Sequence, residues 1–409
     1  MSDVTGEEPT WLDHTYLTKI LQKYTENQLK GIISFTKAPA TKKGENYASS
    51  MHLVTVKYNT TAEPGVLKEI NLIVKSRLEE ELFSQIEEDL NIFLREAQVY
   101  NRIMGAAEEL LRSVNDETRF GPKAIFVDER IIVQEDLKIQ GFSIQNVKTG
   151  LNFESCRLIV EKLAKFHAVT MVLYQKNPDL FRYHLPSNVS EHSSPLHDVY
   201  TNTIKNSIEY CQSNPQLVQY VPKLREFGEK IIPKVINVFS RSQMDRYHVL
   251  NHGDVWVNNM MFRKDVSGKV IEVLFVDYQE GFYGSPGIDW NFFIFSSWQM
   301  EVFQNHFEDL LTKYHSVLSE LLYKLNYDQR IPTVDDVRKE IINKGFHGLI
   351  TATCLLPILI NEHADLADPL NFILKTDEAN ANRQKIFSNP KYGERLEIFL
   401  EYFVRNEIL

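Results

Sequence analysis

Three polar residues near the middle of the chain have the types and the spacing that phosphoryl transfer requires. Asp254 lies five residues before Asn259, and Asp277 directly follows a mostly apolar run, Ile271 to Val276. That run is rich in β-branched and aromatic residues, which predicts a short buried strand ending at the carboxylate. One carboxylate can accept the proton of an attacking hydroxyl, while an Asn and a second Asp hold Mg²⁺ against nucleotide phosphates. Asp and Asn after glycine also mark ordinary turns and helix caps, so that alternative stays open for the isolated residues.

The sequence upstream contains a turn that could cover a nucleotide. We predict strands near residues 32–35 and over His52 to Tyr58, joined by a small polar turn at residues 41–50. The backbone N–H groups and Ser hydroxyls of such a turn can face phosphates. The turn holds a single glycine, so an ordinary hairpin is the simpler explanation when the turn is taken alone.

A third predicted strand, Glu69 to Lys75, ends in a lysine that can pair with nucleotide phosphates when a carboxylate positions it. Glu96 is the candidate carboxylate, because helical spacing places it on one face with Phe93 and Tyr100. All three belong to a long predicted helix from Glu80 to Leu111. The alternative that both charges are solvated stays open at this point.

The order of the predicted elements divides the chain into two lobes. A chain of 409 residues is too long for one ordinary core. Residues 1–137 are rich in predicted strands, including a pair at Phe120 to Phe126 and Ile131 to Gln134. Residues 138–409 are mainly helical and also contain the strand that ends at Asp277. Two lobes with the chemistry between them suit a reaction that must exclude water.

Within the second lobe, three segments carry specific expectations. His167 lies among apolar neighbours of a predicted helix and is expected to be a hydrogen-bonded core residue, not a catalytic one. The mostly polar segment Asp368 to Asn389 is expected on the surface or over a cleft, and a helix is predicted from Arg395 to Asn406. The longest apolar stretch, Ile350 to Ile360, is too short to span a bilayer and predicts a buried helix.

Composition limits the partners and the compartment. The formal net charge of −10 argues against general binding of nucleic acid or of anionic membranes, because phosphate contacts need a basic field. The three cysteines, Cys156, Cys211 and Cys354, are far apart and form no CxxC pair, which favours a reducing compartment. The N-terminus is acidic and has no apolar core, so a signal peptide is not expected. We therefore expect a cytoplasmic protein with no nucleic-acid partner, no membrane association and no obligate protein partner.

Several of these motifs occur in the same order in a known family. The chain resembles the ecdysteroid kinase-like family, a branch of the aminoglycoside phosphotransferase and choline kinase-like group. The motifs that carry the resemblance cover nearly the whole chain: GENYAS (44–49), Lys75, Phe93-x-x-Glu96-x-x-x-Tyr100, Glu135-Asp136-Leu137, LAKFHA (163–168), HGDVWVNN (252–259), VDYQ (276–279) and Gly284-Ser285-Pro286-x-x-Asp289.

The resemblance implies a fold and a set of roles. The fold would be the α+β, two-lobed protein kinase-like fold, with a small β-rich N-terminal lobe and a larger, mainly helical C-terminal lobe. ATP and Mg²⁺ would be the cofactors. Asp254 would be the catalytic base, Asn259 and Asp277 would hold Mg²⁺, and Lys75 paired with Glu96 would grip the phosphates. The remaining implied positions are the adenine-facing backbone of Glu135 and Leu137, the phosphate-covering loop residues Gly44, Asn46, Tyr47, Ala48 and Ser49, and Asp289, which would brace the catalytic loop through His252.

Two positions depart from the family pattern. Tyr278 stands in the VDYQ motif where the family usually has Phe, and its added hydroxyl is expected to change packing more than metal binding. Gln134 stands before the linker, where an aliphatic residue is commoner, and would be polar at the back of the adenine pocket. Adenine contact is therefore the weakest part of the resemblance.

The family name implies a hydroxylated acceptor, with an ecdysteroid-type steroid as the first expectation and a plant or xenobiotic alcohol as the second. A lipophilic acceptor needs an apolar, aromatic pocket with a few polar anchors. The aromatic side chains near the chemistry in sequence could line that pocket, although residues of this type more often belong to the core: Trp256, Tyr278, Phe282, Tyr283, Trp290 and Phe293.

Two other classes of protein were weighed. A non-catalytic kinase-like protein that binds a ligand is disfavoured, because Lys75, Asp254, Asn259 and Asp277 are all present. A protein kinase is disfavoured because only eleven residues separate Asp277 from Asp289, which leaves no room for an activation segment. Preference for ATP over GTP stays open.

Overall fold

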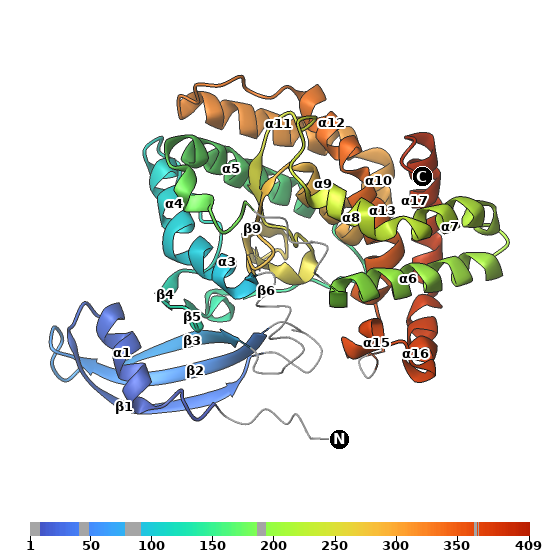
Figure 1. The fold of residues 1–409 in the computed structure, drawn as a ribbon. Helices are drawn as coiled ribbons and strands as arrows, with labels where there is room; N and C mark the ends of the chain where they lie inside the picture. The colour runs from blue at the N-terminus through green and yellow to red at the C-terminus, as the bar shows by residue number, and fades with distance from the viewer. Residues whose placement is uncertain (1–8, 41–48, 78–90, 186–193, 364–365, 367) are drawn as a thin grey trace.

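The computed structural model describes residues 9–40, 49–77, 91–185, 194–363, 366 and 368–409. An antiparallel sheet near the N-terminus is followed by a mainly helical region (Figure 1). The elements of the first part are α1 (His14–Tyr24), β1 (Leu29–Pro39), β2 (Ser49–Thr60), β3 (Lys68–Arg77), α3 (Ile92–Gln98), the π turn η1 (Val99–Ile103), α4 (Met104–Arg112), β4 (Ala124–Val127), β5 (Ile131–Glu135), the 3-10 turn η2 (Leu137–Gln140) and β6 (Phe142–Ser143).

The first sheet has five antiparallel strands in the order β1-β2-β3-β5-β4. Apolar residues that alternate along these strands bury one face of the sheet against α1. The residues of this small core include Leu17, Ile20 and Leu21 of α1 and Val54, Val56, Leu72 and Val74 of β2 and β3. The other face carries Ile132, which belongs to the main core together with Phe93 and Tyr100. The sheet therefore separates α1 from the helix that carries Glu96.

The predicted helix from Glu80 to Leu111 is only partly correct. Residues 78–90 lie outside the described part of the chain. From Ile92 onward the chain is helical, but the π turn η1 interrupts the α-helix directly after Gln98. Single π turns occur often at functional sites, and helical periodicity in a sequence does not reveal them.

The helical part is organised around α9 (Gly287–Ser297), in which all 11 residues are buried. Helices α12 and α13 pack on α9, and α5 packs along α11. The elements of this part are α5 (Phe153–Lys176), η3 (Pro178–Phe181), α6 (Ser194–Ser213), η4 (Val218–Tyr220), α7 (Val221–Glu229), α8 (Ile231–Phe239), β7 (Val249–Asn251), η5 (Val257–Asn259), β8 (Met260–Lys264), β9 (Val270–Phe275), β10 (Phe282–Gly284), α9, α10 (Met300–Asn305), α11 (Phe307–Lys324), α12 (Val334–Asn343), α13 (Gly345–Ile350), the π turn η6 (Thr351–Leu355), α14 (Leu356–Leu359), α15 (Leu370–Ile373), α16 (Asp377–Phe387) and α17 (Pro390–Arg405).

Two small sheets embedded among these helices position the candidate residues. In one, β7 pairs with β10, and in the other the order is β6-β8-β9. The strand predicted before Asp277 is confirmed as β9, and its last residue, Phe275, pairs with Met260 at the start of β8. The chain passes from the first sheet to the second between β5 and β6, where the lobe boundary at 137/138 is predicted. That boundary stays a prediction.

The polar segment Asp368 to Asn389 lies largely at the surface, as expected, but it also contributes a buried charged side chain. This segment forms α15 and α16, and Arg383 of α16 is buried. Its guanidinium group donates to Asn206 Oδ1 at 2.8 Å and to the Leu374 carbonyl at 2.9 Å. A polar sequence therefore covers a buried arginine here, because hydrogen bonds compensate the cost of burying the charge. The last helix also begins earlier than predicted, at Pro390.

The apolar stretch Ile350 to Ile360 is buried, as predicted, and forms η6 and α14. Of the helices in the described ranges, none is by itself long and apolar enough to cross a membrane. Two consecutive helical segments, Val334–Asn343 and Gly345–Leu359, are together long and apolar enough to do so, but the chain bends by 53° between them.

Candidate active site

The loop that follows β7 is held in shape by one buried carboxylate. Asp289, in the first turn of α9, accepts the backbone N–H groups of His252 and Gly253, each at 2.8 Å. Its Oδ2 also lies 3.1 Å from His167 Nε2, and His167 Nδ1 lies 2.6 Å from the Tyr314 hydroxyl. Burial lowers the pKa of His167, which favours a neutral ring that donates to Asp289 and accepts from Tyr314. His167 is thus a hydrogen-bonded core residue, as predicted.

Gly253 is required at its position for two separate reasons. Its φ of +85° lies in the left-handed region that favours glycine. A Cβ atom at this position would also lie 2.2 Å from the Glu280 carbonyl oxygen. The loop and the segment after Asp277 therefore approach too closely to admit any side chain.

We predict that Gly253→Ala strongly destabilises the protein and abolishes any activity of the site, because the clash moves the loop that carries Asp254. The matched control is Gly268→Ala, in the β8–β9 turn. Gly268 has the same φ of +85°, but its Cβ would have no neighbour within 4 Å. Urea unfolding should show a loss of about 1 kcal/mol in the control, from backbone strain alone, and a clearly larger loss in Gly253→Ala. Equal losses of unfolding free energy in the two variants would show that the close approach of Gly253 to the Glu280 carbonyl does not affect stability.

The side chain of Asp254 is fixed by two donors. Asn259 Nδ2 donates to Asp254 Oδ2 at 2.6 Å and to the Asp254 carbonyl at 3.0 Å, and Trp256 Nε1 donates to Oδ2 at 3.3 Å. Burial, assisted by the carboxylates of Asp277 and Glu280, raises the pKa of Asp254 to about 8, against the opposing effect of these hydrogen bonds. A carboxyl group with a raised pKa is better matched to accepting a proton near neutral pH than an ordinary carboxylate.

Asn259 and Asp277 lie at adjacent ends of paired strands. The Val276 N–H donates to the Asn259 carbonyl at 3.0 Å, which places the chain at Asp277 beside Asn259. His252 Nε2 lies 3.0 Å from the Val276 carbonyl, so the catalytic loop also contacts this corner. Asp277 itself has a φ of +67°, which is strained for a residue other than glycine. Strain of this kind is retained where the side chain must point in one direction.

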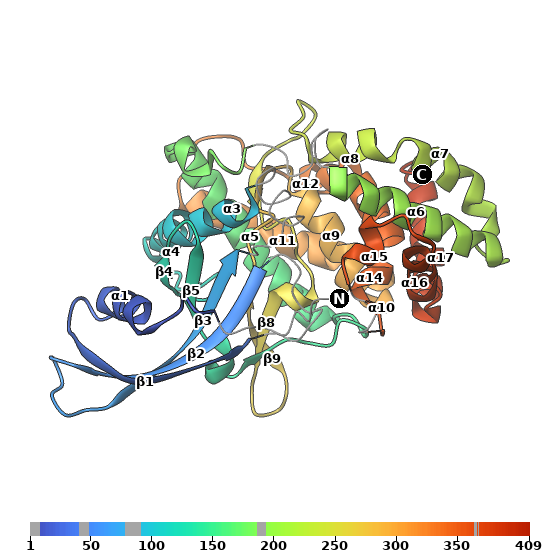
Figure 2. The same cartoon turned by 60° about the horizontal axis from the view of Figure 1, so that its bottom comes forward.

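The predicted contact between Lys75 and Glu96 is confirmed, and it includes a third residue. Lys75 Nζ lies 2.5 Å from Glu96 Oε2 and 2.7 Å from Asp277 Oδ1, so the end of β3 meets the segment after β9 (Figure 2). Burial lowers the pKa of Lys75, but Asp277 and Glu96 outweigh it and hold the pKa above its usual range. Burial raises the pKa of Glu96 to about 7 against the effect of Lys75. The ammonium group of Lys75 on β3 thus connects α3, through Glu96, to the segment after β9 that carries Asp277.

Comparison with known proteins identifies the family. The sequence profile described as "Ecdysteroid kinase-like family" matches residues 43–327, which is more than half of the chain. The chain belongs to the ecdysteroid kinase-like family. The family is one of small-molecule kinases, which implies ATP use and a hydroxylated acceptor, and the predicted kinase-like α+β fold is confirmed.

Two further comparisons add little. No curated protein matches the chain. Among solved structures, an ethanolamine kinase from Plasmodium vivax matches with 12% sequence identity, over 88% of this chain and 83% of that chain, at a TM-score of 0.38. A superposition this loose carries no argument about function.

The nucleotide-facing residues expected for an ecdysteroid kinase-like protein are placed only in part. Gly44, Asn46, Tyr47 and Ala48 lie outside the described residues. Ser49 is the first residue of β2 and is buried.

The linker after β5 is fixed through the side chain of Glu135. Its carboxylate accepts the Lys123 N–H and the Gln140 Nε2 group, each at 2.8 Å, and pairs with Arg119. The Glu135 N–H donates to the Lys123 carbonyl, whereas no backbone carbonyl of the described residues accepts from the Leu137 N–H. The contact of the Leu137 backbone with adenine stays a prediction.

The donor set of this ecdysteroid kinase-like site fits Mg²⁺. No group of three or more His, Cys, Asp or Glu side chains in the described ranges could hold a metal on its own. Mg²⁺ is commonly bound by one or two protein carboxylates together with substrate phosphates, so a complete protein cage is not required. Asp277 supplies a carboxylate, and Asn259, whose Nδ2 is occupied by Asp254, has its amide oxygen available.

The departure at Tyr278 has a structural consequence. Its hydroxyl is buried and donates to the Phe120 carbonyl at 3.2 Å, while its ring stacks edge-on against Tyr100 and tilts against His252. The hydroxyl thus fastens the Asp277 segment to the chain before β4, and it does not point toward Asp277.

We predict that Tyr278→Phe lowers the free energy of unfolding by about 1 kcal/mol, because one buried hydrogen bond is lost while the Phe120 carbonyl keeps the Phe275 N–H as a partner. Urea unfolding measures the change, and ATP binding should be unaffected. Tyr323→Phe, at a position 78% exposed, is the control and should cost nothing measurable. A loss of ATP binding in Tyr278→Phe would show that the hydroxyl acts on the site after all.

The aromatic residues considered for an acceptor pocket are mostly core. Tyr278, Phe282, Tyr283, Trp290 and Phe293 are all buried, and only Trp256 keeps partial exposure. Two residues that the sequence analysis missed lie beside Asp254. Burial raises the pKa of Tyr200 on α6, and the carboxylates of Glu280 and Asp254 add to that shift. Glu280 follows the VDYQ motif directly, whereas no local signal marks Tyr200.

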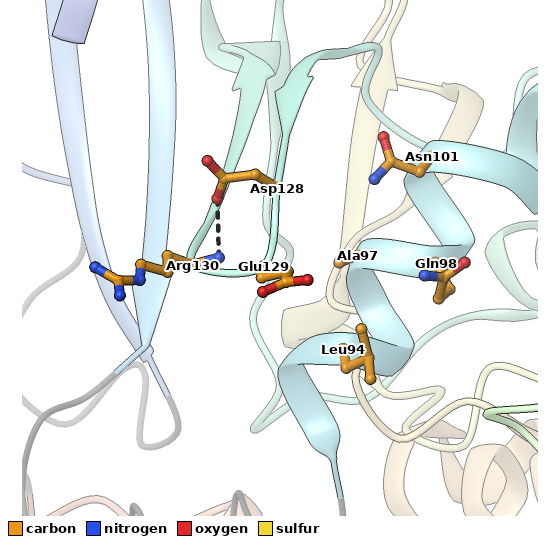
Figure 3. A pocket seen from close by; sticks show the side chains of 7 residues that line it. All are labelled: Leu94, Ala97, Gln98, Asn101, Asp128, Glu129 and Arg130. Carbon is orange, nitrogen blue, oxygen red and sulfur yellow. Dashed lines mark hydrogen bonds between the residues drawn. The ribbon is translucent and has the colours of Figure 1, made fainter.

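A separate hollow of about 390 Å³ lies away from Asp254, between α3 and the β4–β5 turn (Figure 3). Its lining residues are Leu94, Ala97, Gln98, Asn101, Asp128, Glu129 and Arg130. Asp128 is already occupied by the Tyr16 hydroxyl and by the Arg130 and Ile131 N–H groups. The hollow borders the outer side of the helix that carries Glu96, and we assign no ligand to it.

Proposed function

We propose that this ecdysteroid kinase-like protein transfers the γ-phosphate of ATP, with Mg²⁺, to a hydroxyl group of a small lipophilic molecule. An ecdysteroid-type steroid is the first candidate acceptor, in keeping with the family description, and a plant or xenobiotic alcohol is the second. The observation that carries the proposal is the convergence of Lys75, Glu96 and Asp277 at one corner, next to Asp254 and Asn259.

In this proposal each side chain has a separate task. Asp254 accepts the proton of the acceptor hydroxyl as that oxygen attacks the phosphorus, which is the part of phosphoryl transfer that a protein carboxylate can supply. Lys75, oriented by Glu96, neutralises the charge of the nucleotide phosphates. Bound Mg²⁺, held by Asp277 and Asn259, would supply further positive charge at the transferred group. Asp289 and Gly253 keep the loop in place so that Asp254 is already oriented before the acceptor arrives.

The electrostatics of the site support a dependence on bound cations. Asp254, Asp277 and Glu280 are close enough for the last two to raise the pKa of Asp254 to about 8, after the larger effect of burial. A cation next to Asp277 would oppose that shift, because it offsets the negative charge that disfavours ionisation of Asp254. Asp254 would then be a better proton acceptor when the nucleotide and metal are bound than when they are absent.

The test is direct detection of phosphate on an acceptor. The purified protein is incubated with ATP, Mg²⁺ and either a polyhydroxylated steroid or a plant alcohol, and the products are analysed by mass spectrometry. We expect phosphate on the steroid, none without Mg²⁺, and far less in the same time with Asp254→Asn. Transfer only to the plant alcohol would replace the first acceptor by the second. ATP binding without transfer to any acceptor would favour a ligand-binding protein that lacks catalysis.

A further inference from the structure

Gln134 lies on the face of the sheet that a nucleotide would contact. It is the penultimate residue of β5 and pairs with Ile73 of β3, and two residues earlier Ile132 pairs with Lys75. Residues directly opposite in an antiparallel pair point to the same face, and every second residue shares that face. Gln134, Ile132 and Lys75 therefore point to the same side of the sheet, and Gln134 is the last of them before the linker.

The amide group of Gln134 lies in an unusual environment. The residue is 7% exposed, yet its Nε2 atom is fully buried and has no hydrogen-bond partner among the described residues. The hydroxyl of Tyr100, four residues after Glu96, is likewise buried without a partner in the same part of the chain. A buried donor without a partner is costly, so such a group in a native protein calls for an explanation.

The two polar ends of the Gln134 amide differ in access. Nε2 is fully buried toward the interior, near the Tyr100 hydroxyl, but the two atoms form no hydrogen bond. The amide oxygen Oε1 is not among the fully buried atoms, and it accepts no hydrogen bond from a described residue. The amide thus presents an acceptor, and not a donor, on the side that remains accessible.

We propose that Gln134 selects the base of the nucleotide by placing this acceptor opposite the substituent at purine C6. Adenine carries an amino group there, which can donate to Oε1, whereas hypoxanthine and guanine carry an oxo group, which is itself an acceptor. Two acceptors facing each other in a buried site lose a hydrogen bond and repel, so ATP is preferred over ITP and GTP. This inference rests on the proposed function, because it needs a nucleotide that runs from Lys75 to the linker.

The experiment compares ATP with ITP, which differ only at the base: C6 carries an amino group in ATP and an oxo group in ITP, and N1 is an acceptor in ATP and carries a hydrogen in ITP. Binding of each nucleotide with Mg²⁺ is measured by calorimetry for the wild type, Gln134→Met and Gln134→Glu. We expect the wild type to prefer ATP by about tenfold or more, which is the effect of one unsatisfied buried polar group. Gln134→Met removes the acceptor and should reduce the preference for ATP by about tenfold relative to the wild type, because only the contribution of N1 is left. Gln134→Glu keeps an acceptor and should retain the preference.

The control is Gln140→Met, a change of the same type on the adjoining linker, where the amide donates to Glu135 Oε2 at 2.8 Å. It should leave the preference for ATP unchanged. A wild-type protein that binds ATP and ITP equally, or a preference for ATP that is not reduced in Gln134→Met, overturns the assignment of Gln134 and leaves the proposed function intact. Binding of neither nucleotide by the wild type overturns the proposed function as well. Thermal unfolding of each variant without nucleotide shows whether the fold is retained.

Discussion

Asp254→Asn is expected to lower the turnover number by about 10² to 10⁴-fold, the usual contribution of a general base. The substitution keeps the shape of the side chain and an oxygen that can accept from Asn259 and Trp256. It removes only the capacity to take a proton. Steady-state kinetics with ATP and the phosphorylated acceptor measure the loss, and the affinity for ATP should change little because Asp254 faces the acceptor hydroxyl.

The matched control is Asp265→Asn in the exposed β8–β9 turn, where the carboxylate accepts from the Ser267 and Lys269 N–H groups. This variant removes a carboxylate from the turn between β8 and β9 without touching the site, and its turnover should equal that of the wild type. Unchanged turnover in Asp254→Asn would contradict the role of Asp254 as the base.

Lys75→Met is expected to destabilise the protein by about 3 kcal/mol and to abolish stabilisation by ATP. The Lys75 and Glu96 side chains are 4% and 1% exposed, and Lys75 also contacts Asp277. Removal of the ammonium group leaves two neighbouring carboxylates without their cation, and breaking a buried pair in this way costs several kcal/mol. Urea unfolding measures the stability, and the shift of the melting temperature with ATP measures nucleotide binding.

Two further variants show whether the loss of stability in Lys75→Met comes from the buried ion pair or from any substitution of a lysine in β3. Lys68→Met, at the start of the same strand, breaks a solvent-accessible pair with Glu63 and should lower the stability far less than Lys75→Met. The double variant Lys75→Met with Glu96→Gln should recover part of the lost stability, because one of the two unpaired carboxylates is gone and only Asp277 remains. If Lys75→Met is as stable as Lys68→Met, the buried triad of Lys75, Glu96 and Asp277 does not stabilise the fold.

The residues whose positions could be predicted from the sequence are those that lie within a recognisable local pattern of residue types. A mostly apolar run rich in β-branched and aromatic residues predicted the strand before Asp277, and helical spacing predicted that Glu96 would be able to face Lys75. The contact between Asp289 and the His252 backbone was predicted by resemblance, and the structure has it at 2.8 Å. Each of these depends on a short stretch of chain and on the order of the motifs.

Other features depend on contacts between distant segments, which a local pattern does not reveal. Tyr200 reaches the neighbourhood of Asp254 only through the packing of α6, more than fifty residues away in sequence. Five of the six aromatic residues proposed for the acceptor pocket are buried core residues instead, because proximity in sequence to Asp277 does not determine which face of a helix or strand they occupy. The π turn η1 follows from no pattern in the sequence that we recognise.

The most direct test of the central claim is thermal unfolding with ATP, with and without Mg²⁺, for the wild type and for Asp277→Ala. A ligand that binds only the folded state adds about 2.7 kcal/mol of stability at a hundredfold excess over its dissociation constant. We predict a Mg²⁺-dependent rise in the melting temperature of the wild type and a much smaller rise in Asp277→Ala, each relative to the same protein without nucleotide. A wild type whose melting temperature does not respond to ATP and Mg²⁺ would contradict the assignment of this site to phosphoryl transfer.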